Sequence, residues 1–557
     1  MRTLLFTAAK RLLAGLLAGA MAPCQAFASD PASEQLREQQ RTLRQLEQRQ
    51  RLQQWQRRPR PDSDNDTSPT PSSPQACWPV SAIRVSGNRR VTSQALRAAL
   101  QPALKPCMGV ADINHLLKAI TARYVAEGYP ASRPYLARAP QAEAPLEIII
   151  VEGFVESIEL RGNLPLSLRG AFPDLLGQPL HLPALEQGLD QLNRLRAFEL
   201  SADLRPGDAP GATQVLIDGQ QVSKRWHLDS RFDNLGSAHT GRHRLNLGLG
   251  LDSPLGLNDD LRLSLLSTVL DAPGQVQGVN LYYSLPYGPW TFTLNASQAR
   301  YRAPLPGTRH ASHGTSSLAG LNVERLLWRN QQGMLSANLR LDHKRLVNRL
   351  GQQRLQQQSP TLTTLEAGLN LLWLEGGLWN GYLGIAQGLD GFGADSQPLG
   401  KRAPVPDFRK YRASLLHLRQ GPAQRPWRWV SELNLQYSPS LLPAVEQLSL
   451  SEDHAVRGFR QHAVAGASGA TWRNTLSYPL TAFPPVHIRP HLGLDLGWSR
   501  YAPGSDGQQL IGAALGAELS LPQARLRLDY QQPLHASDVP RSALEHGFWV
   551  LEGSLNF

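Results

Sequence analysis

Leu245-Asn246-Leu247-Gly248-Leu249-Gly250-Leu251 is the stretch that decides the fold, because a leucine alternates with a polar or small residue throughout it. Alternation with a period of two is typical of a β-strand with one apolar face. The pattern returns in Leu261–Leu265 and Leu526–Tyr530, and Gly, Asn, Asp and Pro turns separate such segments from about residue 225 onward. Soluble sandwiches seldom sustain alternation for so long, so the pattern predicts a membrane β-barrel.

The length of this region indicates the size of the barrel. About 333 residues remain after residue 225, and about 21 residues per strand and turn give about sixteen antiparallel strands. After residue 28 no apolar run approaches the length of a membrane-spanning helix. A barrel is then the remaining way for this chain to cross a membrane.

The N-terminus indicates export. Arg2, Lys10 and Arg11 precede the apolar stretch Leu12–Ala22, and Ala26-Phe27-Ala28 forms a cleavage site. Residues 1–28 are therefore predicted to be a signal peptide. The formal charge of +12 is spread along the chain without a nucleic-acid-binding motif, so no nucleic-acid partner is expected.

A polar helix is predicted for residues 29–58. Asp30 suits the N-cap, Pro31 the first helical position, and Pro59 ends the pattern. A helix that is polar on almost all sides must be solvated, bridging or lodged in a wet channel, and we favour a plug inside the barrel over a free periplasmic helix. Residues 59–76 are rich in Pro, Ser and Asp and read as a linker.

Two repeats precede the barrel. Ile83-Arg84-Val85-Ser86-Gly87-Asn88 returns as Ile158-Glu159-Leu160-Arg161-Gly162-Asn163, and each copy leads into helical periodicity and then strands. The repeats predict two β-α-α-β-β modules, at 77–153 and 154–222, ahead of a barrel at 223–557. Cys77 and Cys107 favour one disulfide in an exported protein, with two free thiols as the alternative.

The search for chemistry finds one organised pair and no catalytic constellation. No nucleophile and base, metal-ligand set or cofactor motif is present, so neither an enzyme nor a bound cofactor or metal is expected. Val456-Arg457-Gly458-Phe459 forms a loop motif, and Asp495 alternates with glycines in Gly493–Gly497. A bidentate Arg457–Asp495 pair against the inner wall is predicted; the alternative is two lumen charges facing water.

This order of segments resembles the outer-membrane transporters of two-partner secretion, the haemolysin and filamentous-haemagglutinin type, which are related to barrel assembly factors. Several local matches support the resemblance. They are Val456–Phe459, Asp495 with Gly497, Asp233–Ser237 with Thr240-Gly241, Asp252–Asp259, Gly128-Tyr129-Pro130 and the Cys77/Cys107 pair. Two departures stand out: Ser451-Glu452 replaces the Gly-Gly often found before the loop motif, and Gly493 replaces an aromatic residue at the start of the strand motif.

The resemblance implies a sixteen-stranded barrel, two periplasmic polypeptide-transport-associated (POTRA) domains and a plug helix. It implies that Val456, Arg457, Gly458 and Phe459 hold a lumen loop against Asp495, and that the terminal Phe557 is a barrel signal. The expected partners are an unfolded exoprotein with an N-terminal secretion domain (an adhesin, haemolysin or contact-dependent toxin), outer-membrane lipids and the barrel assembly machinery. The expected function is recognition of the exoprotein by the POTRA domains and its export through the barrel lumen, with or without activation. The alternatives are an assembly factor, a passive channel or a barrel-borne hydrolase.

Overall fold

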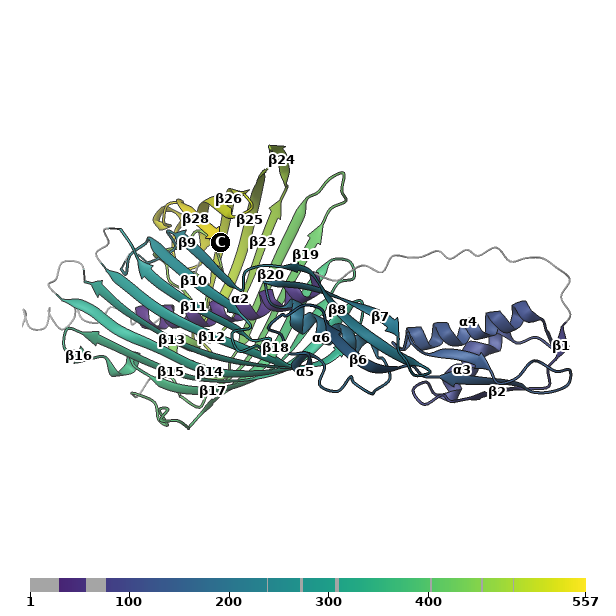
Figure 1. Ribbon diagram of the computed structural model, residues 1–557. Helices are drawn as coiled ribbons and strands as arrows, with labels where there is room; N and C mark the ends of the chain where they lie inside the picture. The colour runs from purple at the N-terminus through teal and green to yellow at the C-terminus, as the bar shows by residue number, and fades with distance from the viewer. Residues whose placement is uncertain are drawn as a thin grey trace, which may run out of the picture.

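The structure is a computed structural model that describes residues 30–56, 77–237, 239–270, 274–305, 310–400, 403–451, 454–483 and 485–557. The predicted signal peptide (1–28) and linker (59–76) lie outside these residues. Figure 1 shows a wide barrel with two small α+β modules extending from one end. The predicted fold class is confirmed.

A closed antiparallel barrel forms the largest part of the molecule. Eighteen strand segments follow one another around it; β16 and β24 only extend hairpins whose partners already pair directly, so 18 − 2 leaves sixteen strands. Its segments are β9 (Trp226–Asp233), β10 (Arg244–Asp252), β11 (Asp260–Thr268), β12 (Gln275–Tyr287), β13 (Trp290–Pro304), β14 (Ala311–Arg329), β15 (Gly333–Leu350), β16 (Gln353–Arg354), β17 (Thr361–Trp373), β18 (Leu378–Leu389), β19 (Arg409–Gln420), β20 (Arg428–Tyr437), β23 (Ser468–Ser477), β24 (Leu480–Phe483), β25 (Val486–Arg500), β26 (Gly507–Ser520), β27 (Ala524–Ala536) and β28 (Phe548–Asn556).

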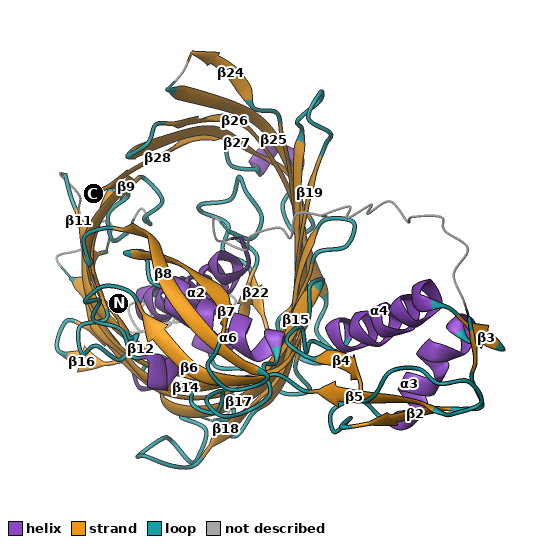
Figure 2. Ribbon diagram, turned by 45° about the vertical axis from the view of Figure 1, so that its right-hand side comes forward, coloured by secondary structure: helices purple, strands orange, loops and turns teal. Residues whose placement is uncertain are grey.

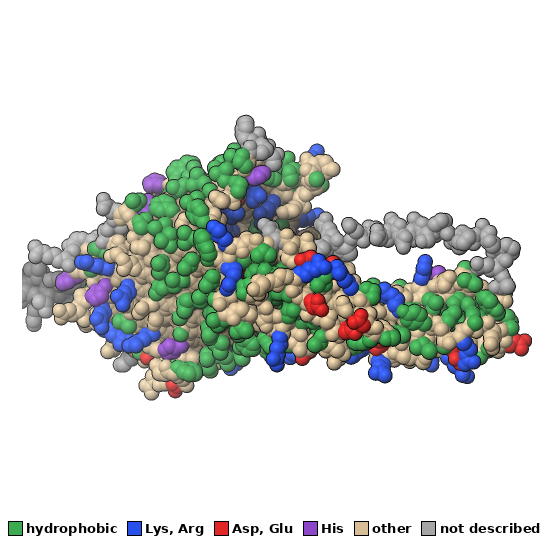
Figure 3. All heavy atoms as spheres, viewed as in Figure 1, with side chains coloured by type: hydrophobic (Ala, Val, Ile, Leu, Met, Phe, Trp, Pro, Cys, Tyr) green, Lys and Arg blue, Asp and Glu red, His purple; other side chains and the backbone are tan. Residues whose placement is uncertain are grey.

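The barrel strands have one lipid-facing and one lumen-facing side, as the alternation predicts. In β13, the side chains of Phe292 and Leu294 are exposed while Thr293 and Asn295 are buried in the interior. Outward apolar side chains form a broad band across the face of the barrel that Figure 3 shows, where they are green. The polar groups of the other side therefore line the lumen, as in transmembrane barrels.

The first module, which begins after residue 76, packs helices on a three-stranded sheet of order β2-β5-β4 with β2 and β5 parallel. Leu116, Ile120 and Ile148 lie at the centre of its core. Its elements are β1 (Trp78–Pro79), β2 (Ile83–Ser86), α3 (Ser93–Leu100), the 3-10 turn η2 (Gln101–Ala103), β3 (Cys107–Met108), α4 (Val110–Ala126), β4 (Arg133–Leu136) and β5 (Leu146–Val151).

The second module repeats this topology, with sheet order β6-β8-β7 and β6 parallel to β8. Its elements are β6 (Phe154–Leu160), α5 (Leu168–Ala171), α6 (Leu182–Asn193), β7 (Phe198–Pro206) and β8 (Ala212–Val222). It contacts the barrel closely: Gly288 N donates to Gly170 O over 2.8 Å, and the Arg194 guanidinium donates to Ser284 Oγ over 2.7 Å. These contacts identify the module end of the barrel.

The helix α2 (Pro31–Gln56) runs through the barrel lumen, as Figure 2 shows. Asp30 caps it, because its Oδ1 accepts a hydrogen bond from Ser33 N over 3.0 Å. Among the described residues, no helix has the length and apolar character needed to span a membrane. The sequence favoured a plug inside the barrel over a free periplasmic helix, and in the structure the helix lies inside.

Candidate functional site

The loop between β20 and β23, here called the lumen loop (residues 438–467), folds back inside the barrel. It contains the 3-10 turn η4 (Ala444–Glu446), the short strands β21 (Leu448–Ser449) and β22 (Ala465–Gly466), and the Val456–Phe459 motif. At its centre, Arg457 Nε donates to Asp495 Oδ2 and Nη2 to Oδ1, each over 2.6 Å. Arg457 N also donates to Oδ2, over 3.0 Å.

Both members of this pair are fully buried. The side chains of Arg457 and Asp495 have no exposed surface. Arg457 Nη2 also donates to Asn474 O over 2.8 Å. A buried bidentate pair has a fixed geometry, and removing one member leaves the other charged and without water. The pair therefore fixes the loop motif to the β25 wall.

Glycines on the wall make room for the motif. A Cβ at Gly493 would lie 2.2 Å from Arg457 Nη2, so this departure from the family's aromatic residue leaves space that the guanidinium occupies. A Cβ at Gly512, on the neighbouring β26, would lie 1.8 Å from Arg457 O. Asp495 and Gly512 are cross-strand partners, so the carboxylate that binds the Arg457 side chain lies beside the glycine that leaves room for the Arg457 carbonyl.

The other residues of the motif complete the contact. Gly458 has a φ of +99°, which disfavours any residue with a Cβ, and its N–H donates to Gln531 Oε1 over 3.1 Å. Val456 and Phe459 are buried in a small apolar cluster with Leu450 and Val464. The whole Val456–Phe459 segment is thus held against β25, β26 and β27.

Glu446 is a second anchor that the sequence did not reveal. Its carboxylate accepts from Lys410 Nζ over 2.5 Å and contacts Lys344 Nζ. All three side chains are buried. The lysines come from β19 and β15, which are far from Glu446 in the sequence, so no local motif could have shown them together.

A third anchor holds the end of the motif. The Glu545 carboxylate accepts hydrogen bonds from the backbone N–H groups of Arg460, Gln461 and His462. Successive backbone N–H groups that bind one carboxylate in this way form a nest, which fixes the position of the backbone rather than of a particular side chain. It too was missed, because the donors are main-chain groups and carry no sequence signature.

Polar contacts hold α2 in the lumen along its length. Arg340 contacts Glu47 with an Nη2–Oε1 distance of 2.6 Å, and Arg244 Nη1 lies 2.6 Å from Glu38 Oε1. Gln50 Nε2 donates to Asp260 Oδ2 over 2.6 Å. Among the described side chains of α2, a short apolar stripe accompanies these contacts, with Leu36 and Leu43 buried against the wall. Figure 1 shows α2 spanning the barrel interior.

The helix and the lumen loop touch each other. Arg37 Nη1 donates to Ala444 O over 2.7 Å, and Val445 belongs to the apolar cluster that contains Leu36 and Leu43. Glu446 follows immediately. The η4 turn therefore lies between the helix and the two lysines of the wall.

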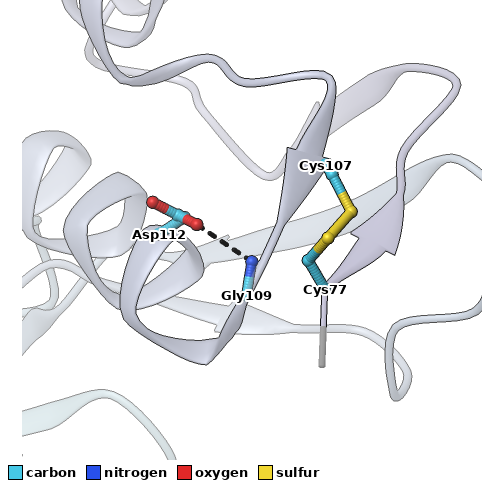
Figure 4. Close-up of a disulfide and its surroundings, with 4 residues drawn as sticks. All are labelled: Cys77, Cys107, Gly109 and Asp112. Atoms are coloured by element: carbon cyan, nitrogen blue, oxygen red, sulfur yellow. Dashed lines mark hydrogen bonds between the residues drawn. A yellow bond between two sulfur atoms is a disulfide. The ribbon is translucent and has the colours of Figure 1, made fainter. Parts of the chain in front are cut away.

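The first module carries the disulfide, drawn in Figure 4. Cys77 and Cys107 are bonded with a Cα–Cα distance of 5.4 Å, which joins the start of the module to β3. Beside it, Asp112 accepts from Lys105 Nζ over 2.6 Å and from Gly109 N over 3.0 Å. Both bonds hold the pKa of Asp112 below its ordinary value.

The barrel closes where its ends meet. β28 pairs with β9 through five residue pairs, from Glu552 with Asp233 to Asn556 with Asp229. Beyond them, Phe557 N donates to Leu228 O over 2.8 Å, while the Phe557 side chain stays exposed. The terminal residue therefore takes part in the seam through its backbone and leaves its ring available.

Comparisons with known proteins find matches to one family of transporters along most of the chain. Residues 211–519 match the family model "Haemolysin secretion/activation protein ShlB/FhaC/HecB". Residues 78–153 match the ShlB-type POTRA domain and residues 154–206 a further POTRA domain.

Individual relatives extend this match. The chain is 33% identical to the hemolysin transporter protein HpmB of Proteus mirabilis over 89% of its length and 88% of the relative. It is 33% identical to the outer membrane transporter CdiB of Escherichia coli, over 79% of this chain and 76% of that relative. The solved CdiB structure from Escherichia coli superposes with a TM-score of 0.83 at 29% identity, covering 94% of this chain and 98% of that one.

Proposed function

Because the chain belongs to the ShlB/FhaC/HecB family of haemolysin secretion/activation proteins, we propose that it exports an unfolded exoprotein through its barrel lumen by two-partner secretion. It is an outer-membrane transporter whose two modules lie in the periplasm. The division into plug helix (29–58), linker (59–76), POTRA domains (77–153 and 154–222) and barrel (223–557) follows from this proposal.

The observation that carries the proposal is a lumen filled by a removable element. Over residues 31–51, whose side chains the structure describes, α2 is held mainly by polar contacts that water or a passing polypeptide can replace, and its large apolar contacts there form a short stripe. A permanent core would be apolar throughout. The lumen is therefore built to be emptied while the barrel wall remains intact.

The periplasmic modules offer a means of capturing an extended chain. β2 and β4 are the edges of the first sheet, and β6 and β7 are the edges of the second. An edge strand presents unpaired backbone groups that an incoming strand can complete by β-augmentation. No ATP is available in the periplasm, so binding at these edges and folding outside the cell supply the direction of transfer.

The three anchors of the lumen loop keep it out of the path when the helix leaves. Arg457–Asp495, Glu446 with its two lysines, and Glu545 tie the loop to different parts of the wall. We assign Arg457, with Val456, Gly458 and Phe459, the role of holding the loop in the conducting conformation. Glu446 is assigned the role of sensing the helix, since its neighbours Ala444 and Val445 contact α2.

The partners follow from the same proposal. The exported protein is one exoprotein of the adhesin, haemolysin or contact-dependent toxin kind, carrying an N-terminal secretion domain. The exposed Phe557 ring is the recognition signal for the barrel assembly machinery, and the apolar band contacts outer-membrane lipids. An assembly factor is the alternative function, and relatives that are themselves transporters favour export over it.

Secretion of the exoprotein encoded beside this chain tests the proposal. Cells carrying the wild type, Arg457→Ala or no transporter are compared, and heat-modifiability confirms that each barrel is folded. We expect a folded Arg457→Ala barrel with lost secretion. Unchanged secretion in Arg457→Ala contradicts the role of the loop, and unchanged secretion without the transporter contradicts export itself.

A further inference from the structure

The outward face of β12–β15 changes character toward the end of the barrel that is distant from the modules. In register across β13, β14 and β15, Leu294, Leu321 and Leu341 form one outward row. Four residues further along β13, Gln298 pairs with Ser317, which pairs with Arg345. Lipid-facing leucines are thus replaced by polar and basic side chains along the same strands.

The next two rows are more basic. Arg300 pairs with Thr315 and Arg302 with His313, while Arg349 lies opposite His313 on β15. Arg300, Arg302, Arg345 and Arg349 are all exposed, and the buried residues between them, such as Tyr301 and Leu346, face α2 in the interior. The four arginines therefore point outward, away from the translocation path.

Within the part of the chain that the structure describes, no carboxylate neutralises this face. None of the four guanidiniums forms an ion pair with a carboxylate of the described residues, and the outward positions of these rows on β12–β15 include no Asp or Glu. Arg300, Arg345 and Arg349 line a shallow depression with Gln298, His313 and Thr315. Figure 3 shows basic and histidine side chains at this end of the barrel, beyond the apolar band.

The distance of the arginines from the module end of the barrel places them at one surface of the membrane. Trp290 marks the module end of β13, and Arg300 lies ten residues along the strand. Ten residues at about 3.3 Å, tilted by about 40°, rise about 25 Å, which is the thickness of the apolar band of such barrels. Since the modules are periplasmic, Arg300 and its neighbours lie at the headgroups of the outer leaflet.

We propose that Arg300, Arg302, Arg345 and Arg349 form a binding site for a phosphorylated lipid headgroup of the outer leaflet. Guanidinium groups bind phosphate oxygens bidentately, and a site beside lipid-facing leucines receives the acyl chains of the same molecule. The patch continues the lipid-facing side of the strands, so its occupant is a lipid rather than the exoprotein. The inference rests on the outer-membrane placement but not on export.

Binding of lipopolysaccharide to the purified full-length protein tests this site. The test variant replaces the four arginines by Gln; the matched control removes the same charge from the exposed module residues Arg84, Arg89, Arg90 and Arg97. A basic residue at a lipid surface contributes about fivefold to binding, so the test variant should bind more than about a hundredfold more weakly, while the control binds as wild type.

Further arms identify the source of the phosphate and guard against misfolding. Four Arg→Lys substitutions keep the charge but lose the bidentate contacts, so their binding should fall between that of the wild type and that of the four-Gln variant. Dephosphorylated lipopolysaccharide should bind weakly, and millimolar inorganic phosphate should not displace the lipid. If the four-Gln barrel does not fold, the pairs Arg300→Gln/Arg302→Gln and Arg345→Gln/Arg349→Gln replace it. Equal binding by folded Gln variants and wild type overturns the site, as does displacement by free phosphate. Secretion, measured in parallel, reports separately on export.

Discussion

At the residue scale, the Arg457–Asp495 pair is the most demanding feature of the lumen. Both side chains are fully buried, so the free energy of the pair depends on having both charges present. Removing one partner of a buried pair typically destabilises by about 3–5 kcal/mol, because the other charge stays uncompensated. The pair is thus expected to fail when either member is neutralised, and not only when its shape is lost.

We therefore predict that Asp495→Asn, which is nearly isosteric, abolishes most secretion, and that Arg457→Lys does so as well because an ammonium cannot reproduce the bidentate contact. Secretion assays with barrel levels matched by heat-modifiability provide the measurement. Asp506→Asn, which neutralises an exposed carboxylate in the turn before β26, is the control. Normal export by Asp495→Asn would show that the charge of the pair is dispensable.

Gly512 provides a steric counterpart to this electrostatic prediction. A Cβ there meets the carbonyl oxygen of Arg457 at 1.8 Å, and a backbone atom held by its neighbours cannot simply rotate away. Gly512→Ala should move the loop and lower secretion, whereas Gly278→Ala on β12, whose Cβ meets nothing closer than 3.6 Å, should not. Protease protection of the lumen loop, compared between the two variants, measures the displacement. Equal protection would argue against the contact.

At the element scale, α2 behaves as a plug whose hold on the wall is polar. Deleting residues 30–56 should raise the ion conductance of the barrel in planar bilayers, since nothing then fills that part of the lumen. Glu47→Gln and Arg340→Gln should each raise the frequency of open events, because each leaves one buried charge without its partner. A substitution of an exposed residue on the same helix, Arg49→Gln, serves as the control. A conductance that is unaffected by the deletion would show that α2 does not limit the pore.

The first module should depend on its disulfide. The double substitution Cys77→Ser/Cys107→Ser removes a crosslink between residues 30 positions apart. In the chain-entropy model this loss costs roughly 3–4 kcal/mol of stability. In the full-length protein, thermal unfolding of the first module is measured by its susceptibility to proteolysis. The unfolding temperature of the module should fall, while the barrel remains heat-modifiable. No change in the module's protease resistance on substitution would indicate that the α3–α4 core suffices alone.

At the scale of the whole molecule, features set by residues close together in the sequence could be predicted, and features set by contacts between distant segments could not. Alternation in Leu245–Leu251 and similar stretches follows from local contact with lipid and water, so strand number and barrel class could be inferred. The repeat of Ile83–Asn88 likewise sufficed for two modules of one topology. The structure also contains the Cys77–Cys107 disulfide and the Arg457–Asp495 pair; the two cysteines left in an exported chain pointed to the first, and the loop and strand motifs pointed to the second.

What could not be inferred depends on closure of the barrel. Glu446 meets Lys344 and Lys410 only because the loop folds inward across strands that are distant in sequence. Glu545 binds main-chain groups, and the wall residues that α2 contacts, such as Asp260 and Arg340, are distant from it in the sequence, although its place in the lumen was favoured from its polarity. The basic outward rows of β13–β15 required the register, since a shift of one residue would turn every arginine inward.

The central claim is that the exoprotein passes through the lumen only after α2 has left it. Gln39 Oε1 accepts from Ser297 Oγ over 2.9 Å, so Gln39→Cys/Ser297→Cys allows a short reducible thiol crosslinker to tie helix to wall. Secretion is measured before and after crosslinking and after reduction, with Gln39→Cys alone treated identically. We predict that secretion stops in the crosslinked protein and returns on reduction; continued secretion through a fully crosslinked barrel would contradict the account.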